Sequence, residues 1–237
     1  MKKTLLIITQ LLFALTLSAQ TQQELRDSLS MINRLIEEHP RAVKLRLRKA
    51  ALNIDLEQWE YALDEYTNVL EMMPTNLTAL YYRGFVNQHL QRYAFARKDY
   101  ETLLMVDPQN EHALMGLILT NIADNHKTKA YDDANRLVEL FPDHATSYAI
   151  RADIEEQLNM DMAALEDIEK AIKIEDVEVQ KKYPHTMDDD IASYQLTAFS
   201  LYIKKGDTKK ARKALDYLVS QGISRTALTD QYSLLKK

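Results

Sequence analysis

Small and aromatic side chains recur along this chain at the spacing of a helix. Ala62 is followed four residues later by Tyr66, and Ala96 is followed four residues later by Tyr100. Residues three or four apart share one helix face, so the small residue lets a second helix approach while the aromatic fills the space beside it. The chain contains only four glycines and five prolines, which indicates long helices joined by short turns. The pattern therefore predicts packed helices.

The same positions return at a fixed interval. The alanine position and a proline position both recur every 34 residues, at Ala62, Ala96, Ala130 and Ala164 and at Pro40, Pro74, Pro108 and Pro142. A fixed period of this length indicates one small unit that is copied and stacked. Proline ends a helix because it cannot donate a backbone hydrogen bond and because it biases the preceding residue away from helical geometry. The polar residues that follow the prolines, Asn76, Asn110 and His144, are placed to cap the next helix.

These features resemble the tetratricopeptide repeat family, whose 34-residue unit is a helix–turn–helix that closes on a proline. Ala62-x3-Tyr66 and Ala96-x3-Tyr100 match its second helix, and Gly84 matches the glycine of its first. The resemblance implies an all-α, right-handed superhelical solenoid of stacked helix–turn–helix hairpins. It also implies a non-enzymatic scaffold that binds a partner protein or a peptide of unknown identity in a concave groove.

The period divides the chain into segments. We expect a signal peptide at 1–19, an N-terminal capping helix at 20–42, four repeats at 43–76, 77–110, 111–144 and 145–178, an insertion at 179–191, a divergent hairpin at 192–223 and a C-terminal capping helix at 224–237. The insertion follows from the interval between Ala164 and Ala211, which is 47 residues, or one period plus 13. It is either an extended loop or a lengthening of the helices around it.

The first residues have the order of a secretory signal. Lys2 and Lys3 precede a largely apolar run from Leu5 to Leu17, and Ser18-Ala19 offers a small residue for cleavage. The run falls short of the roughly 20 apolar residues that a membrane span requires. We expect cleavage after Ala19, a mature chain with no transmembrane segment, and a protein exported to the periplasm or outside the cell, with an envelope complex as its setting.

The net charge and the absence of cysteine exclude some classes of partner and of covalent modification. The net charge is −5, and removal of Lys2 and Lys3 with the signal moves it to −7. Binding of nucleic acid requires a concentrated basic face, so we expect no nucleic acid partner. The chain has no cysteine, which excludes disulfides and a lipid anchor attached through an N-terminal cysteine.

The resemblance also places a candidate groove. In the family the concave wall is formed mainly by the first helix of each hairpin. Carried over to this chain, the partner-binding residues are Lys44, Leu47, Tyr81, Phe85, Gln88, His89, His112, Met115, Leu119, Asp153 and Glu156. We expect an apolar centre with histidines beside it and acidic residues after it, suited to an extended peptide or an amphipathic helix. The alternative is that some of these residues pack against the neighbouring hairpin.

Candidate chemistry is sparse. Six histidines are present, but none forms the His-Glu-x-x-His spacing of a helical zinc site, and the pair His89 and His112 lacks an acidic third ligand. We therefore expect no metal, no cofactor and no catalytic residue. Two alternatives stay open. One is an enzymatic or accessory role for the insertion through His185 and Asp188, and the other is self-association of the arrays through their end helices.

Overall fold

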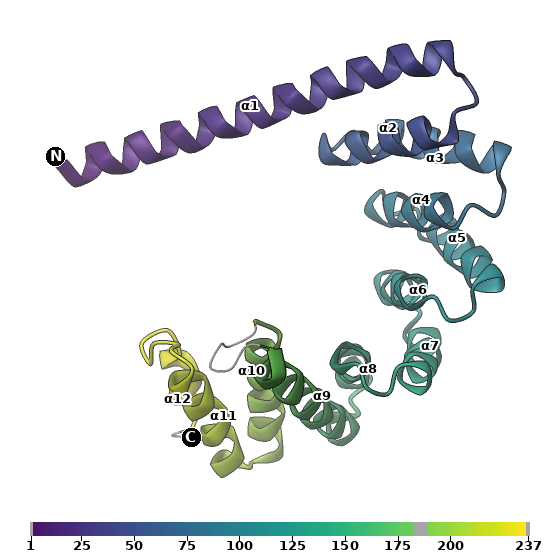
Figure 1. Ribbon diagram of the computed structural model, residues 1–237. Helices are drawn as coiled ribbons and strands as arrows, with labels where there is room; N and C mark the ends of the chain where they lie inside the picture. The colour runs from purple at the N-terminus through teal and green to yellow at the C-terminus, as the bar shows by residue number, and fades with distance from the viewer. Residues whose placement is uncertain (1, 183–188, 236–237) are drawn as a thin grey trace. The chain divides into compact units, whose positions relative to one another are not determined.

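The regular elements of this protein are all helices. The computed structural model describes the backbone of residues 2–182 and 189–235 and the side chains of residues 20–175 and 190–235. Within these residues there are twelve helices and no strand, so the all-α prediction is confirmed (Figure 1). The helices are α1 (Lys2–Glu38), α2 (Val43–Asp55), α3 (Trp59–Met72), α4 (Leu77–His89), α5 (Tyr93–Val106), α6 (Glu111–Ala123), α7 (Lys127–Leu140), α8 (Ala145–Gln157), α9 (Asp161–Lys182), α10 (Asp189–Lys205), α11 (Thr208–Ser220) and α12 (Thr229–Leu234).

One turn geometry joins the two helices of each repeat. In four successive turns a non-glycine residue has a positive φ of 57° to 61°, at Glu57, Gln91, Asn125 and Asn159. The next backbone N–H then bonds back into the preceding helix, as Arg92 N–H does to the carbonyl of Asn87 at 2.8 Å. This is the closure that commonly ends helices with a left-handed residue. In the α10–α11 turn the left-handed residue is Gly206, which adopts the conformation without steric cost.

The proline turns separate one hairpin from the next. Helices α1, α3, α5 and α7 each end two residues before a proline of the period. The predicted capping is confirmed at two positions, where the side chains of Asn76 and Asn110 accept hydrogen bonds from Ala79 N–H and Ala113 N–H at 2.9 and 3.0 Å. It is wrong at His144, whose side chain makes no capping bond to α8.

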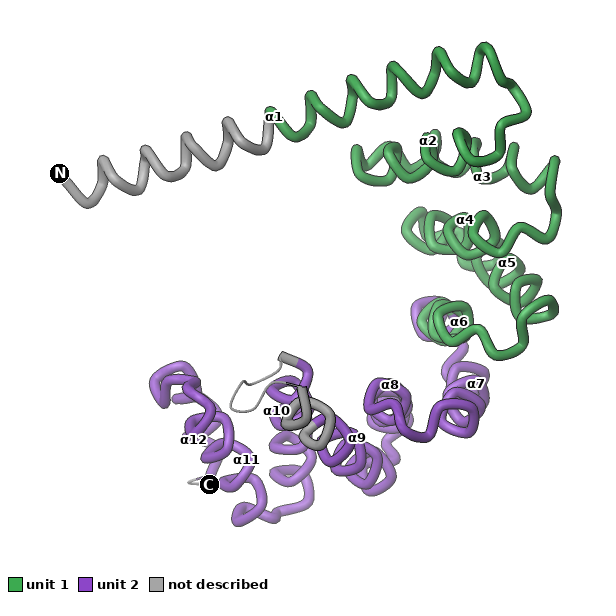
Figure 2. The backbone as a smooth tube through the Cα atoms, viewed as in Figure 1, with its two compact units in different colours: residues 1–120 green, residues 121–237 purple. Residues whose placement is uncertain are grey.

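The chain forms two compact units, residues 1–120 and 121–237 (Figure 2). In the first unit α2 packs on α3, α3 on α4 and α4 on α5, and α1 packs on α2. In the second unit the packed pairs are α7 with α8, α8 with α9, α9 with α10 and α10 with α11. The alanines of the period are fully buried in both units, Ala62 and Ala96 in the first and Ala130 and Ala164 in the second. Burial of these small residues is what permits close helix packing.

The structure gives bounds for the helices around the predicted insertion and at the two ends of the array. Helix α9 continues to Lys182 and α10 begins at Asp189, so the insertion lengthens the flanking helices, while residues 183–188, with His185 and Asp188, lie outside the described residues. The predicted capping helix at 224–237 is shorter, because residues 225–228 form turns and α12 covers only Thr229–Leu234. Helix α1 runs unbroken from Lys2 to Glu38, across the boundary expected at Ala19. No helix in the described residues has the length and apolar character of a membrane span.

Candidate functional site

A hollow of about 360 Å³ opens between α4, α5 and α6, and all of its lining residues lie within residues 1–120. We call it the groove. Its lining consists of aromatic, apolar and amide side chains, two histidines and one glycine: Tyr81, Phe85, Gln88, His89, Tyr100, His112, Met115, Gly116 and Leu119. Helix spacing explains this arrangement. Tyr81, Phe85 and Gln88 lie on successive turns of one face of α4, and His112, Met115 and Leu119 do the same on α6. Seven of the predicted residues are thereby brought together.

Tyr100 and Gly116 were missed by sequence reasoning. The Tyr100 ring is buried, and it lies against two glycines from the neighbouring helices. A Cβ built at Gly84 would come within 3.0 Å of the ring, and one built at Gly116 would come within 2.6 Å, closer than packed atoms allow. Both helices therefore approach the ring only because these positions lack a side chain. Tyr100, predicted as the packing aromatic of its repeat, is also the floor of the groove.

Rings from three hairpins lie around the groove. Trp59, the only tryptophan of the chain, begins α3 and stacks on His89 with a centroid separation of 3.7 Å. It also meets the Phe85 ring at 6.2 Å. On the other side Tyr81 lies edge-on to His112 at 6.3 Å. Such pairs favour fixed relative orientations of the rings.

The two tyrosine hydroxyls of the groove stay neutral. Burial raises the pKa of the Tyr100 hydroxyl, and burial followed by the nearby Tyr82 raises the pKa of the Tyr81 hydroxyl. Both phenols therefore keep their protons at physiological pH. The Tyr100 hydroxyl donates to Gln88 Oε1 at 3.4 Å. Among the nine lining residues there is no carboxylate, and Phe85 and Leu119 remain 37% and 45% exposed. The groove thus offers accessible apolar surface together with a few hydrogen-bonding groups.

Known proteins resemble this chain in sequence and in structure. No family model matches it. The small glutamine-rich tetratricopeptide repeat-containing protein 2 of Saccharomyces cerevisiae is 27% identical over 135 residues, which are 56% of this chain and 35% of that protein, so the chain spans about a third of the relative's length. A solved tetratricopeptide repeat protein from Parabacteroides merdae matches this structure with a TM-score of 0.58 at 21% sequence identity. The match covers 92% of this chain and 80% of the Parabacteroides merdae chain.

The structure of YrrB, described as a tetratricopeptide repeat protein with an unusual peptide-binding site, has a TM-score of 0.60 at 19% identity and covers 85% of this chain and 97% of its own. These likenesses agree with the hairpins and the 34-residue period. The chain has the tetratricopeptide repeat fold. The sequence likeness and the structural neighbours together support the resemblance to that family.

The other predicted groove residues of this tetratricopeptide array are not among the residues that line the groove. Lys44 and Leu47 belong to α2, where Lys44 is exposed and Leu47 is half-buried, and neither lines the hollow. Asp153 and Glu156 belong to α8 in the second unit. Asp153 accepts from Gln157 Nε2 at 3.0 Å, and Glu156 pairs with Lys204 of α10 at 2.5 Å. Glu156 therefore has a structural partner already.

The histidines do not complete a metal centre in the described part of the array. No three His, Cys, Asp or Glu side chains in that part lie close enough together to hold an ion. His89 instead stacks on Trp59, and His112 meets Tyr81. His185 and Asp188, the residues of the alternative enzymatic or accessory role, lie outside the described residues.

Proposed function

We propose that this protein is a non-enzymatic scaffold that binds a peptide segment of a partner protein in the groove between α4, α5 and α6. The observation that carries the proposal is the accessible apolar lining over a rigid aromatic floor, with Phe85 and Leu119 exposed above the buried Tyr100. The volume of about 360 Å³ is suited to one or two bulky side chains.

Three further points support the proposal. Tetratricopeptide arrays serve as protein-binding scaffolds, and the structural neighbour YrrB carries a peptide-binding site. The nine lining residues include two histidines but no serine, cysteine or carboxylate, so neither histidine has a nucleophile or a carboxylate partner among them. Aromatic side chains in a desolvated pocket are the usual anchors of a binding surface. The ligand is therefore a peptide with at least one large apolar residue.

Trp59 provides a direct test, because it is the only tryptophan and lies beside the groove on His89. Peptides selected from an immobilised library by the full chain are titrated against its tryptophan fluorescence. We expect selected peptides to share a bulky apolar residue and to change the Trp59 emission on binding. The variant Phe85→Ala with Leu119→Ala should bind at least about tenfold more weakly.

The matched control is Tyr61→Ala with Met105→Ala. Both residues are exposed, at 65% and 76%, and neither lines the groove. This variant should bind like the unmodified chain. Equal affinity of all three proteins would place the binding site elsewhere and would contradict the proposal. Concentration-dependent mass in solution without peptide binding would favour self-association instead.

We also propose that the protein is exported from a bacterial cell and acts in an envelope complex. The support is the order of Lys2-Lys3, the apolar run from Leu5 to Leu17 and the small residues Ser18-Ala19. Expression of the full chain in a bacterium should give a processed protein that begins at Gln20 in the periplasmic fraction. Leu11→Arg should block processing, whereas Gln22→Arg, beyond the apolar run, should not. An unprocessed cytosolic protein would contradict export.

A further inference from the structure

One position of the repeat differs in chemistry between the first three repeats and the fourth. Asn53, Asn87, Asn121 and Glu155 stand 34 residues apart, and all four side chains are buried. Each lies in the last full turn of the first helix of its hairpin. In the second, third and fourth repeats a carboxylate of the second helix acts on it, whereas Asn53 Nδ2 in the first repeat is buried without a hydrogen-bond partner. An asparagine amide can donate two hydrogen bonds, whereas an ionised glutamate can only accept. The substitution thus removes a donor and adds a charge at a buried position.

The second repeat shows how the asparagine acts. In the α4–α5 hairpin Arg83 donates to both oxygens of Asp99, at 2.9 and 2.7 Å. Asn87 Nδ2 also donates to Asp99, at 3.3 Å. In the third repeat Asn121 Nδ2 donates to Asp133 at 3.0 Å. At both places the amide is a neutral donor to a carboxylate, so no second negative charge is buried there.

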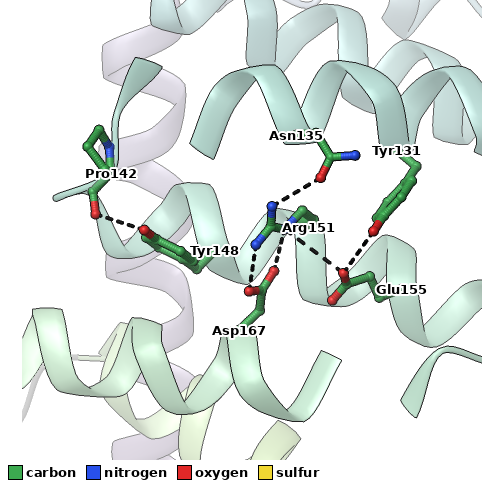
Figure 3. A network of polar contacts seen from close by, with 7 residues as sticks. All are labelled: Tyr131, Asn135, Pro142, Tyr148, Arg151, Glu155 and Asp167. Atoms are coloured by element: carbon green, nitrogen blue, oxygen red, sulfur yellow. Dashed lines mark hydrogen bonds and ion pairs between the residues drawn. The ribbon is translucent and has the colours of Figure 1, made fainter. Parts of the chain in front are cut away.

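The fourth repeat keeps the arginine and the aspartate but changes the third member. Arg151 donates to both oxygens of Asp167, at 2.5 and 2.8 Å, and to Asn135 Oδ1 at 3.0 Å (Figure 3). Its Nε lies 3.9 Å from Glu155 Oε1. Glu155 Oε1 also accepts from the Tyr131 hydroxyl at 3.3 Å. Glu155 Oε2, by contrast, is buried without a hydrogen-bond partner, although the residue is only 3% exposed.

The titratable groups around Glu155 come from the three helices that form this cluster. Helix α7 contributes the neutral Tyr131 hydroxyl, α8 contributes Arg151, and α9 contributes Asp167 and, farther out, Glu166. Arg151 is already bonded to both oxygens of Asp167, so one guanidinium faces two buried carboxylates. Burial is the largest influence on Glu155, and repulsion by Asp167 adds to it. Together they raise the Glu155 pKa to about 7.

We propose that Glu155 is a buried proton-binding site that makes the packing of α8 against α7 and α9 sensitive to pH near neutrality. With its proton, Glu155 carries a neutral donor, as the asparagine does at this position of the second and third repeats. Without it, a second negative charge lies beside Asp167 with one arginine shared between the two carboxylates, and Oε2 lacks a hydrogen-bond partner. The hairpin is therefore complete in the protonated state and loosened in the ionised state.

The direction of the effect follows from proton linkage. The folded protein holds the Glu155 proton more tightly than the unfolded chain does, so protons stabilise the folded state. This contribution is fully present below the unfolded pKa of a glutamate, about 4.3. It is lost as the pH rises from there through about 7. Alkaline conditions should thus loosen α8 while leaving the α4–α5 hairpin, built with Asn87, unaffected.

The direct test is a 13C NMR titration of the glutamate side-chain carboxyl groups in the full chain, with the Glu155 resonance assigned by its absence from Glu155→Gln. We expect this carboxyl to titrate with a midpoint between about pH 6 and 8. Its proton affinity should therefore be more than about tenfold higher than that of an ordinary glutamate. A midpoint near that of the exposed glutamates would overturn the proposal. This readout uses the unmodified protein and does not depend on how the variant folds.

A second measurement tests the consequence for packing. Amide hydrogen exchange of the full chain is followed at pH 5.5 and 8 and corrected for intrinsic rates. Protection of α8 and the first half of α9 should fall at least several-fold at pH 8, and it should not fall in Glu155→Gln. The matched control is Glu139→Gln, an exposed glutamate of α7, which should behave like the unmodified chain. Equal pH responses in all three proteins would overturn the proposal.

Discussion

The α4–α5 and α8–α9 hairpins share one backbone plan and differ in what they offer to their surroundings. Both join their helices through a left-handed residue, Gln91 in one and Asn159 in the other, and both pair an arginine with a buried aspartate. The α4–α5 hairpin completes that pair with an amide, whereas the α8–α9 hairpin completes it with a second carboxylate. A repeat can therefore keep its fold while one buried position changes its response to protons.

The same contrast holds on the exposed surface of the first helices. Phe85, Leu119 and Asp153 stand at one repeat position, 34 residues apart, and all three are exposed. In the first unit this position presents apolar side chains to the groove, and in the second it presents a carboxylate bonded to Gln157. Repetition thus fixes where a side chain points, and the residue chosen there decides what can bind.

The largest effect should come from removing the arginine of each hairpin. Arg151→Met leaves Asp167 and Glu155 buried without their cation, and at pH 8 it should lower the free energy of unfolding by about 3–5 kcal/mol. Arg83→Met should cost less, because Asp99 keeps the Asn87 amide and no second carboxylate lies beside it. Urea unfolding at one pH compares the two. Equal losses would remove the distinction between the hairpins.

The second-largest effect should come from placing a second carboxylate in the α4–α5 hairpin of the first unit. Asn87→Asp places a second carboxylate beside Asp99 and removes the amide donor, at a cost of about 1–3 kcal/mol at pH 8. Because the new carboxyl binds its proton more tightly in the folded state, the loss should shrink toward pH 5. Urea midpoints across this range measure it. Glu155→Asn is the reciprocal variant, and it should make the stability of the second unit depend less on pH. If the stabilities of both variants changed with pH in the same way, the proposed difference between the two hairpins would be wrong.

A smaller effect concerns the packing beneath the groove. At an interior helix position, alanine normally gives a helix that is about 0.5–1 kcal/mol more stable than glycine does. At Gly116 the added Cβ would lie 2.6 Å from the Tyr100 ring, so overpacking should outweigh that gain and leave a net destabilisation of about 1–2 kcal/mol. Gly84→Ala, with its closest contact at 3.0 Å, is the milder control. Thermal unfolding ranks the two, and a stabilised Gly116→Ala would show that Tyr100 can move aside.

The smallest effect should follow from breaking the surface ion pair between Arg92 and Glu60. The pair is 2.7 Å long, but its side chains are 42% and 60% exposed, so water screens the charges. Glu60→Gln should change the free energy of unfolding by less than about 1 kcal/mol, and the change should disappear in high salt. Urea unfolding with and without 0.5 M salt checks this. A large, salt-resistant loss would mean that exposed pairs matter here as much as the buried arginine clusters.

Part of this architecture could be predicted because it depends on local rules. The period of Pro40 to Pro142 and of Ala62 to Ala164 predicts packed helices and their turns, since proline ends helices and alanine permits close approach. Seven of the predicted groove residues line the hollow because helix spacing places them on one face. Lys44 and Leu47 follow the same spacing but lie outside it, because the hollow depends on which helices flank α5.

Three features were decided only by the tertiary structure. Tyr100 is a packing residue by its motif, and it becomes the groove floor because Gly84 and Gly116 from two other helices leave room for its ring. Glu57 and Gln91 adopt left-handed backbone that their residue types do not indicate, because the hairpin closure requires it.

Glu155 is the third feature. By itself the sequence determines that a glutamate replaces the asparagine of the earlier repeats at this position. Only folding decides that this glutamate is buried beside Asp167 with a single shared arginine. The identity of a side chain is a property of the chain, whereas the cost of its charge depends on which neighbours the fold removes from water and brings within reach.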